Sequence, residues 1–280
     1  MSNTSDSSGP AIAIRRSRGW SGINVRELFR YRELLYFLTW RDIKVRYKQT
    51  ALGAAWAILQ PLMTMAVFTI FFGRIAKIPS DGAPYPIFFY AALLPWTYFA
   101  NAVSLSSNSL VASSNMIQKV YFPRLLVPIG GTIAGLVDYL IALSILVVMM
   151  VYYHIVPGPQ LLLLPLLMVL SFLAAAGAGL WLSALNVQFR DVKYTVPFLV
   201  QVWLFLTPVI YPTSALPARY RWLLALNPMT GVVEGHRAII LHSRPLDWFL
   251  LLLSLAVALV LFAGGAMYFK RMERTFADVI

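Results

Sequence analysis

Cysteine is absent from the sequence, and charged residues are scarce. Asp, Glu, Lys and Arg make up 12% of the 280 residues, whereas about a quarter of the residues in a soluble domain are charged. Without cysteine, neither a disulfide nor a thiolate metal site can form. Only three histidines occur, and no cluster of acidic residues or spacing typical of metal ligands is present. The composition therefore excludes a disulfide-stabilised domain and predicts no metal site.

Nucleotide-binding and catalytic motifs are missing as well. No G-x-x-x-x-G-K-[ST] pattern occurs, so the chain cannot hold ATP phosphates in a Walker A loop. H-E-x-x-H and G-x-S-x-G are also absent. His242 and Asp247 have the H-x-x-x-x-D spacing of membrane acyltransferases, but Pro245 between them would break a shared helix. We therefore expect no catalytic residue and no cofactor in this chain, which is predicted not to be an enzyme.

Long hydrophobic runs, in contrast, recur along the whole chain. Hydrophobic residues make up 59% of it, and about 20 apolar residues suffice to cross a hydrocarbon core of roughly 30 Å. We predict an all-α membrane protein with six transmembrane helices. The formal net charge of +12 fits basic residues that orient helices and meet anionic lipid better than it fits nucleic-acid binding. The transmembrane domain, 52–269, has predicted spans at 52–72, 87–111, 125–153, 161–185, 196–211 and 248–269.

The sequence before the first span has two parts. Residues 1–25 are rich in Ser, Gly and Arg and are predicted to be a cytoplasmic tail; the apolar run Ala11–Ile14 is too short for a signal peptide. Residues 26–48 predict an amphipathic interface helix, because charges recur every three or four residues. This helix anchors and orients the chain or has a dedicated docking or lipid-gating role, and the two are compatible. Its charged face consists of Arg26, Arg30, Glu33, Arg41, Lys44 and Lys48, and Arg46 lies off that face.

Lysine and arginine are distributed unevenly over the predicted topology. If the N-terminus is inside, ten lie in residues 1–51, two in the loop before the third span, two in 186–195 and three in the C-terminal tail, 270–280. These seventeen compare with six on the other side. By the positive-inside rule, both termini are predicted to lie in the cytoplasm.

The segment 212–246, before the last span, is neither a clean span nor a typical soluble loop. Four prolines divide it, leaving two short helix-like stretches, Ala218–Leu226 and Met229–His242. Broken helices persist at membrane depth only where protein buries them or water lines them. The pattern therefore predicts a re-entrant element or an extracytoplasmic lid.

Ionisable residues within the apolar segments are few. Asp138 is the only one well inside a predicted span, where a charge is costly. It either contributes a polar point on a transport pathway or makes a structural hydrogen bond to a neighbouring helix. Glu234 and Arg237 are three residues apart and can pair on one helix face, which favours a structural ion pair over direct substrate contact. A proton-coupled carrier would have more such groups, so their scarcity predicts an external energy source.

Five segments, taken together, resemble permeases of the polysaccharide-exporting branch of type-2 ABC transporters, which carry O-antigen, teichoic acid or capsule. They occur in order along nearly the whole chain after residue 25. They are WRDIKVRYKQTALGAAWAILQP (40–61), PYPIFFYAALLPWTYF (84–99), KVYFPR (119–124), FRDVKYTVP (189–197) and NPMTGVVEGHR (227–237).

This resemblance implies a homodimer that works with two copies of a separate ATPase, which binds ATP and Mg²⁺. It implies a coupling helix at 113–124, a second cytoplasmic contact at about 186–193, and gate helices after the fifth span. Residues expected at the ATPase contacts are Gln118, Lys119, Tyr121, Arg124, Arg190 and Asp191, and those expected at the gate are Asn227, Glu234 and Arg237.

The expected substrate is a lipid-linked polysaccharide. Lys and Arg suit phosphate groups, so the basic end of the interface helix is expected to hold a lipid pyrophosphate. The Ser- and Asn-rich half of the second span is expected to meet sugar hydroxyls. The phosphate candidates are Arg41, Lys44, Arg46 and Lys48, and the pathway candidates are Asn101, Ser104, Asn108 and Asp138.

Two alternatives remain open at this stage. The chain is a type-2 ABC permease for a drug, haem or small lipid if its pore is narrow and apolar. It is an integral membrane transferase if catalytic groups gather in one place, against which the lack of acidic clusters argues.

Overall fold

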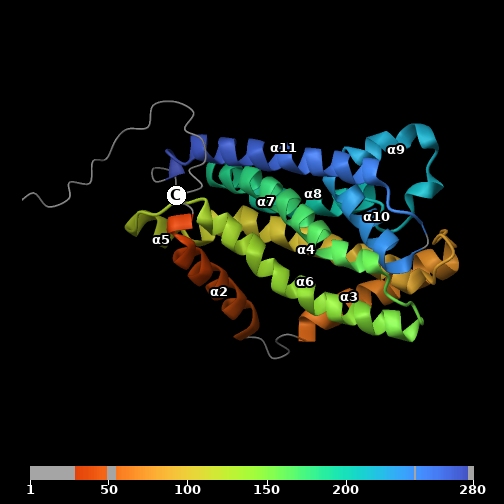
Figure 1. Cartoon of the computed structure of the whole chain (residues 1–280). Coiled ribbons are helices and arrows are strands. Elements are labelled where there is room, and N and C mark those ends of the chain that lie inside the picture. The colour runs from red at the N-terminus through yellow and green to blue at the C-terminus, as the bar shows by residue number, and fades with distance from the viewer. Residues whose placement is uncertain (1–28, 49–54, 243, 277–280) are drawn as a thin grey trace, which may run out of the picture.

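The computed structural model describes residues 29–48, 55–242 and 244–276, and this part of the chain contains helices and no strand (Figure 1). The predicted tail 1–25 and the first residues of the predicted interface helix lie outside it. The α-helices are α2 (Arg32–Lys48), α3 (Ala55–Phe68), α4 (Tyr85–Ala112), α5 (Ser114–Lys119), α6 (Leu126–Tyr152), α7 (Leu164–Gln188), α8 (Val192–Leu206), α9 (Ala218–Ala225), α10 (Pro228–Leu241) and α11 (Trp248–Met272). A π-helix, η1 (Thr69–Ile75), prolongs α3, and 3₁₀ turns occur at η2 (Pro159–Leu163) and η3 (Thr213–Ala215).

Five helical segments in the described residues are long and apolar enough to cross a membrane. They are Ala55–Ile75, Tyr85–Ala112, Leu126–Tyr152, Pro159–Gln188 and Trp248–Met272.

The fifth of the six predicted spans, 196–211, differs from its prediction. Its helix, α8, has only 15 residues and is shorter than a typical span. It ends at Thr207, whose hydroxyl donates to the carbonyl of Trp203 at 2.8 Å. Pro208 follows and has no backbone N–H to continue the helical hydrogen bonds. The turn at Thr207–Pro208 therefore shortens this segment.

The long helix α4 forms the centre of the bundle. It packs against α6, α7, α10 and α3. Helix α11 packs against the side of α7 that is turned away from α4. Aromatic side chains fill part of this core. Phe68 of α3 stacks on Phe89 of α4, with 4.8 Å between the ring centroids, and Phe99 of α4 meets Trp203 of α8 edge to face. The central position of α4 explains its mixed composition, because protein rather than lipid surrounds it.

Small residues allow α7 and α11 to come into backbone contact. A Cβ added at Gly177 of α7 would lie 2.7 Å from the backbone nitrogen of Phe262 on α11. A Cβ at Gly265 would in turn lie 2.6 Å from the Gly177 carbonyl oxygen. Glycine is required at both positions, since close packing of small residues is a main source of helix association in lipid.

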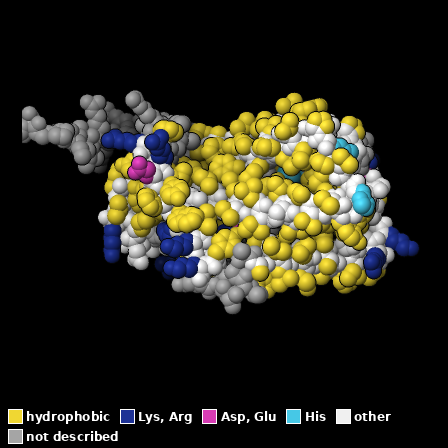
Figure 2. Space-filling model, turned by 60° about the horizontal axis from the view of Figure 1, so that its bottom comes forward, with side chains coloured by type: hydrophobic (Ala, Val, Ile, Leu, Met, Phe, Trp, Pro, Cys, Tyr) yellow, Lys and Arg dark blue, Asp and Glu magenta, His cyan; other side chains and the backbone are white. Residues whose placement is uncertain are grey.

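The flanks of the bundle are strongly apolar. Figure 2 shows hydrophobic side chains covering the middle of the molecule, with basic groups gathered toward its two ends. Large exposed residues on α3, η1 and α8 contribute to such flanks, including Met63, Phe71, Phe198 and Phe205. A membrane-spanning bundle requires this distribution, because charges are stable only where they reach the head groups or water.

Helix α2 runs obliquely along α6, from the end of the molecule that carries α5 toward its middle (Figure 1). Leu38 is buried, and Arg46 is turned toward α6. Exposed apolar residues, among them Phe37 and Val45, accompany the exposed Arg41 on the rest of the helix. The polar and apolar residues of α2 are thus less cleanly separated than the spacing of the charges suggests. Arg46 in particular faces α6, because a carboxylate of that helix pairs with it.

Beyond the fifth predicted span, the segment 212–246 contains two short helices, α9 and α10, close to the two helix-like stretches expected there. They lie at the end of the molecule opposite α5 (Figure 1). α10 packs against α4, α7 and α11, whereas α9 has few neighbours. The segment is therefore anchored in the bundle through its second helix.

Candidate functional site

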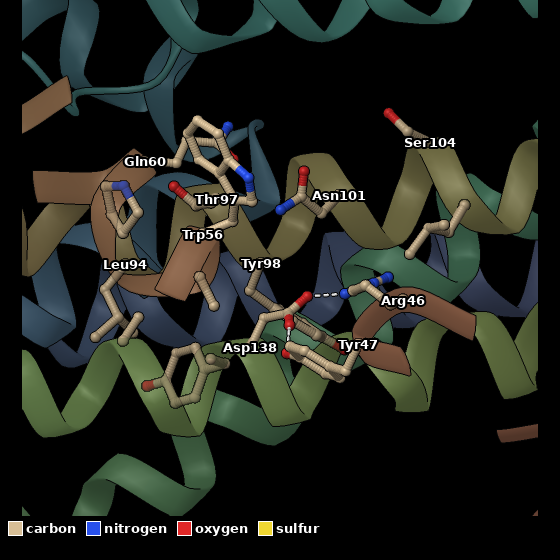
Figure 3. A pocket seen from close by; sticks show the side chains of 15 residues that line it. Arg46, Tyr47, Trp56, Gln60, Leu94, Thr97, Tyr98, Asn101, Ser104 and Asp138 are labelled. Carbon is tan, nitrogen blue, oxygen red and sulfur yellow. Dashed lines mark hydrogen bonds and ion pairs between the residues drawn. The ribbon is translucent and has the colours of Figure 1, made fainter. Parts of the chain in front are cut away.

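A cavity of about 430 Å³, lined by both polar and apolar residues, opens between the C-terminal end of α2 and the helices α3, α4 and α6 (Figure 3). Three of the four pathway candidates line it, and so does one of the four predicted phosphate-binding residues. Its polar lining is Arg46, Tyr47, Gln60, Thr97, Tyr98, Asn101, Ser104, Asp138 and Tyr139, and its aromatic lining includes Trp56.

Asp138 forms one wall of this cavity and is held by two residues of α2. It is the thirteenth of the 27 residues of α6 and so lies near the middle of that helix. Arg46 makes an ion pair with its Oδ2, and the Tyr47 hydroxyl donates to its Oδ1. Figure 3 shows the three side chains meeting at the end of α2. A carboxylate at this depth is stable because both of its oxygens have partners.

Burial shifts the pKa values of the two α2 residues in opposite directions. It lowers the pKa of the Arg46 guanidinium from its ordinary value, and the electrostatic interactions of Arg46 with Tyr47 and Asp42 oppose that change. Burial raises the pKa of the Tyr47 phenol, so this group keeps its proton at neutral pH. Tyr47 is therefore a hydrogen-bond donor to Asp138, while Arg46 supplies the positive charge.

The opposite wall offers polar groups without partners among the described residues. Gln60, Thr97, Asn101 and Ser104 line the cavity, and their side chains make no hydrogen bond within the described part of the chain. Trp56, which is half-exposed, lies beside Gln60 and Thr97 (Figure 3). Amide and hydroxyl groups beside an aromatic ring can bind a sugar, because a pyranose has hydroxyls at its edge and an apolar C–H face.

The other phosphate candidates lie outside the cavity. Arg41 pairs with the adjacent Asp42 at 2.8 Å, and Lys44 and Lys48 are exposed on α2. Asn108, the remaining pathway candidate, lies one turn beyond Ser104 and accepts a hydrogen bond from the Asn186 amide of α7 at 3.2 Å. The cavity therefore brings together Arg46, Asn101, Ser104 and Asp138, and it leaves out Arg41, Lys44, Lys48 and Asn108.

The residues expected at the coupling contacts lie at the α5 end of the molecule. Gln118, Lys119 and Tyr121 are exposed, and Tyr121 is 89% exposed. Arg190 and Asp191 are exposed in the turn between α7 and α8. Arg124 is different, because its guanidinium donates to the carbonyl of Glu273 at the end of α11, at 2.6 Å.

At the other end of the molecule, Arg237 is a buried hub. Its side chain is 3% exposed, makes the expected ion pair with Glu234 at 2.8 Å and lies over the ring of Phe88. It donates to three carbonyls of the turn after α8, those of Pro208, Val209 and Tyr211. Glu234 also accepts from Thr213 at 3.1 Å. The pair therefore fixes the chain around α10.

Asn227, the third gate residue, joins α8 to α10. Its Oδ1 accepts from the backbone of Met229, which caps α10, and from the indole of Trp203, each at 3.0 Å. Its amide donates to the hydroxyl of Thr207 at 2.8 Å. Asparagine is a favoured N-cap because its side chain satisfies an unpaired N–H of the first turn.

Several contributors to these sites carry no distinctive sequence signal. Asp81, in the loop after η1, accepts from Ser214 at 2.8 Å and from Arg244 at 3.1 Å, and it lines a second cavity of about 470 Å³ beside Glu234. In the sequence, Asp81 stands between a Ser and a Gly in a polar loop, a pattern that predicts only a turn. Gln60 and Trp56 were within a predicted span, and only the packing of α3 beside α4 shows that they face a cavity.

Comparisons with known proteins identify the family. The profile described as ABC-2 type transporter matches residues 33–241, which is most of the chain. The chain is 30% identical over 260 residues to the O-antigen export system permease protein RfbA of Myxococcus xanthus, covering 91% of this chain and 98% of that protein. It is 24% identical to a protein of the same name from Klebsiella pneumoniae, covering 89% and 95% of the two chains. It is 27% identical to the polysialic acid transport protein KpsM of Escherichia coli, covering 83% and 91%.

These relatives agree with the polysaccharide-exporting branch to which the sequence motifs pointed. Together with five apolar helices long enough to span a bilayer, they identify an integral membrane protein of the bacterial inner membrane. By their names, these relatives are a permease protein and a transport protein of export systems. The chain belongs to the ABC-2 type transporter family and is homologous to permeases that export O-antigen and polysialic acid.

Proposed function

We propose that this chain is the membrane subunit of an exporter that moves a lipid-linked polysaccharide out of the cytoplasm, using ATP hydrolysed by a separate subunit. Two copies of the chain and two copies of the ATPase form the complex. The observation that carries the proposal is the cavity at the end of α2. There a guanidinium, an indole, and amides and hydroxyls that have no partner among the described residues lie together at the side of an apolar bundle.

The cavity suits both parts of such a substrate. Arg46 provides a positive charge for a phosphate of the lipid carrier, with Lys48 nearby in sequence at the exposed end of α2. Asn101, Ser104 and Gln60 provide donors and acceptors for sugar hydroxyls, and Trp56 provides a stacking surface. A small apolar drug would leave these polar groups without partners, which costs binding free energy. The polar lining thus favours polysaccharide over the alternative of a drug or small lipid.

In this proposal the α5 end of the molecule lies in the cytoplasm, together with both chain termini. The exposed Lys119 and Tyr121 after α5, and Arg190 between α7 and α8, contact the ATPase. The short helix α8 completes a six-span subunit, and α2 lies at the membrane interface with its C-terminal end inserted beside α6. ATP-driven movement of the ATPase is transmitted through these cytoplasmic segments to the bundle.

At the opposite end, α9 and α10 form the extracytoplasmic gate. Arg237 and Glu234 hold the base of this gate against α4 and the turn after α8. Asp81 holds its entrance loop through Ser214 and Arg244. Polymer passage requires the outer contacts to open, while the buried base remains in place.

Reconstitution with the partner ATPase tests the proposal. Proteoliposomes that contain the complex should transfer lipid-linked polysaccharide across the bilayer in the presence of ATP, and the lipid-linked polymer should stimulate ATP hydrolysis. Trp56→Ala should weaken that stimulation, whereas Trp222→Ala, exposed on α9 and distant from the cavity, should not. The proposal fails if lipid-linked polymer neither stimulates ATP hydrolysis nor is transported, while a short-chain lipid or a drug does both.

A further inference from the structure

The last turn of α11 is bound to the segment that follows α5, although 149 residues separate them in sequence. The backbone N–H of Arg124 donates to the Glu273 carboxylate at 3.1 Å. The Arg124 guanidinium donates in the other direction, to the backbone carbonyl of Glu273 at 2.6 Å. Each residue therefore satisfies a backbone group of the other, and we call these two bonds the Arg124–Glu273 clasp.

The clasp has a physical reason at both of its ends. Glu273 is the C-cap of α11, where the last carbonyls of the helix have no intrahelical partner. A cation at that position is favoured by the helix dipole. Glu273 also pairs with Lys270 at 2.9 Å, one turn earlier on α11, and its side chain is mostly buried. The guanidinium of Arg124 is thus engaged within the chain rather than exposed at a docking surface.

Apolar residues next to the clasp belong to a buried cluster. Phe276, three residues after Glu273, is fully buried and meets the ring of Phe269 edge to face at 5.2 Å. Both belong to a cluster that also contains Ile117 of α5 and Phe122 of the segment after it. A helix as short as α5, with six residues, is not stable by itself. Its orientation therefore depends on this cluster and on the clasp.

We propose that Glu273 and Phe276 are positioning residues that hold residues 114–124 in the orientation that engages the ATPase, so that the segment after α11 is part of the coupling device. Movement of α5 is then transmitted to the cytoplasmic end of α11 through the clasp, in addition to the direct connections to α4 and α6. The transmission step rests on the proposed contact with an ATPase, whereas the positioning step concerns this chain alone.

Hydrogen–deuterium exchange of the permease without its partner tests the positioning step. Glu273→Ala should increase exchange in residues 114–124 by about tenfold, the factor expected when a hydrogen bond to a charged group is lost. Glu273→Gln keeps an acceptor oxygen for the Arg124 N–H and should retain most of the protection. Lys270→Ala is the matched control, because it removes the ion pair to the same carboxylate and leaves the clasp intact. Equal exchange in Glu273→Ala and Lys270→Ala would overturn the inference.

Covalent closure of the clasp tests the transmission step in the complex with the ATPase. The chain has no cysteine, so the pair Arg124→Cys and Glu273→Cys introduces the only thiols in this subunit. If the two segments move as one body, the oxidised pair should export as much polymer per ATP as its reduced form or more. The single variant Glu273→Ala should export several-fold less polymer per ATP while still copurifying with the ATPase. Loss of export on oxidation would show that the segments must separate, and would overturn the inference.

The two measurements also separate this inference from the proposed function. If polysaccharide is not transported but Glu273→Ala still exposes residues 114–124, the positioning role stands and the substrate assignment falls. If export occurs and exchange is unchanged, the substrate assignment stands and the clasp has no positioning role.

Discussion

Asp138 and Arg46 illustrate how one charged pair can serve both stability and binding. Each charge needs the other at this depth, since an unpaired charge away from water is costly. The pair also borders the cavity, so an anionic ligand that reaches Arg46 must compete with Asp138 for its guanidinium. Under the proposed function, Asp138 would therefore be both a structural partner of α2 and a residue of the transport pathway.

This competition predicts that substitutions of Asp138 and Arg46 change the apparent affinity for substrate in opposite directions. Asp138→Asn should lower the concentration of lipid-linked substrate that half-maximally stimulates ATP hydrolysis, by about tenfold, because the competing carboxylate is gone. Arg46→Gln should raise that concentration by a similar factor. Substrate titrations of ATPase activity in the reconstituted complex measure both shifts. Arg41→Gln is the control, since Arg41 pairs with Asp42 and does not line the cavity. An equal effect of Arg41→Gln and Arg46→Gln would mean that the basic residues of α2 only orient the chain in the membrane and do not bind substrate.

Gly177 gives a prediction about stability at the same scale. Alanine is a better helix former than glycine by about 1 kcal/mol, so propensity alone favours Gly177→Ala. The new Cβ would lie 2.7 Å from the Phe262 backbone nitrogen, however, and the backbone of α11 cannot turn aside as a side chain can. We expect a net loss of about 2 kcal/mol, typical of overpacking, and a lower midpoint of thermal unfolding in detergent. Gly130→Ala should be neutral or stabilising, because its nearest neighbour, Leu38 Cβ, is 3.4 Å away.

At the scale of elements, residues 114–124, the proposed coupling segment, combine an exposed surface with a fixed base. Lys119 and Tyr121 are exposed, whereas Ile117 and Phe122 are buried in the cluster beneath them. Charge reversal at Lys119 should therefore reduce copurification of the ATPase several-fold without affecting membrane insertion. Lys77→Glu, in the loop near η1 at the other end of the molecule, provides the control. Unchanged copurification and export in Lys119→Glu would exclude this residue from the contact.

The segment proposed as the outer gate also combines a fixed base with a part that is expected to move. The Ser214 hydroxyl donates to the Asp81 carboxylate at 2.8 Å, and Asp81 lines the second cavity, so cysteines at these two positions would lie close enough to test for a disulfide. We expect oxidation of Asp81→Cys with Ser214→Cys to reduce export at least about tenfold, and reduction to restore it, while ATP binding continues. A transport assay with and without reductant measures this. Full export through the oxidised pair would mean that this contact does not open during transport.

At the scale of the whole molecule, the sequence predicts more of the fold than of the sites. Five of the six predicted spans correspond to helices that are long and apolar enough to cross a membrane. The four prolines from Pro212 to Pro245 mark the interrupted segment. Periodicity does not give depth, however, so it cannot show that Arg46 alone among its basic neighbours reaches Asp138. Nor does any local pattern indicate that Glu273 binds Arg124, because that contact depends on where two distant helix ends meet. The sites missed by the sequence are those assembled from separate elements.

The division of labour between subunits is the last property of the whole molecule to test. No Walker A motif occurs in the sequence, so the chain cannot hold the phosphates of ATP in a loop of that kind. The purified chain should therefore hydrolyse no ATP above background, and activity should appear on addition of the partner ATPase. A partner in which the Walker A lysine is replaced should bring the complex back to background, which identifies the source of the activity. ATP turnover that persists in the isolated chain after rigorous purification would contradict the assignment of hydrolysis to a separate subunit.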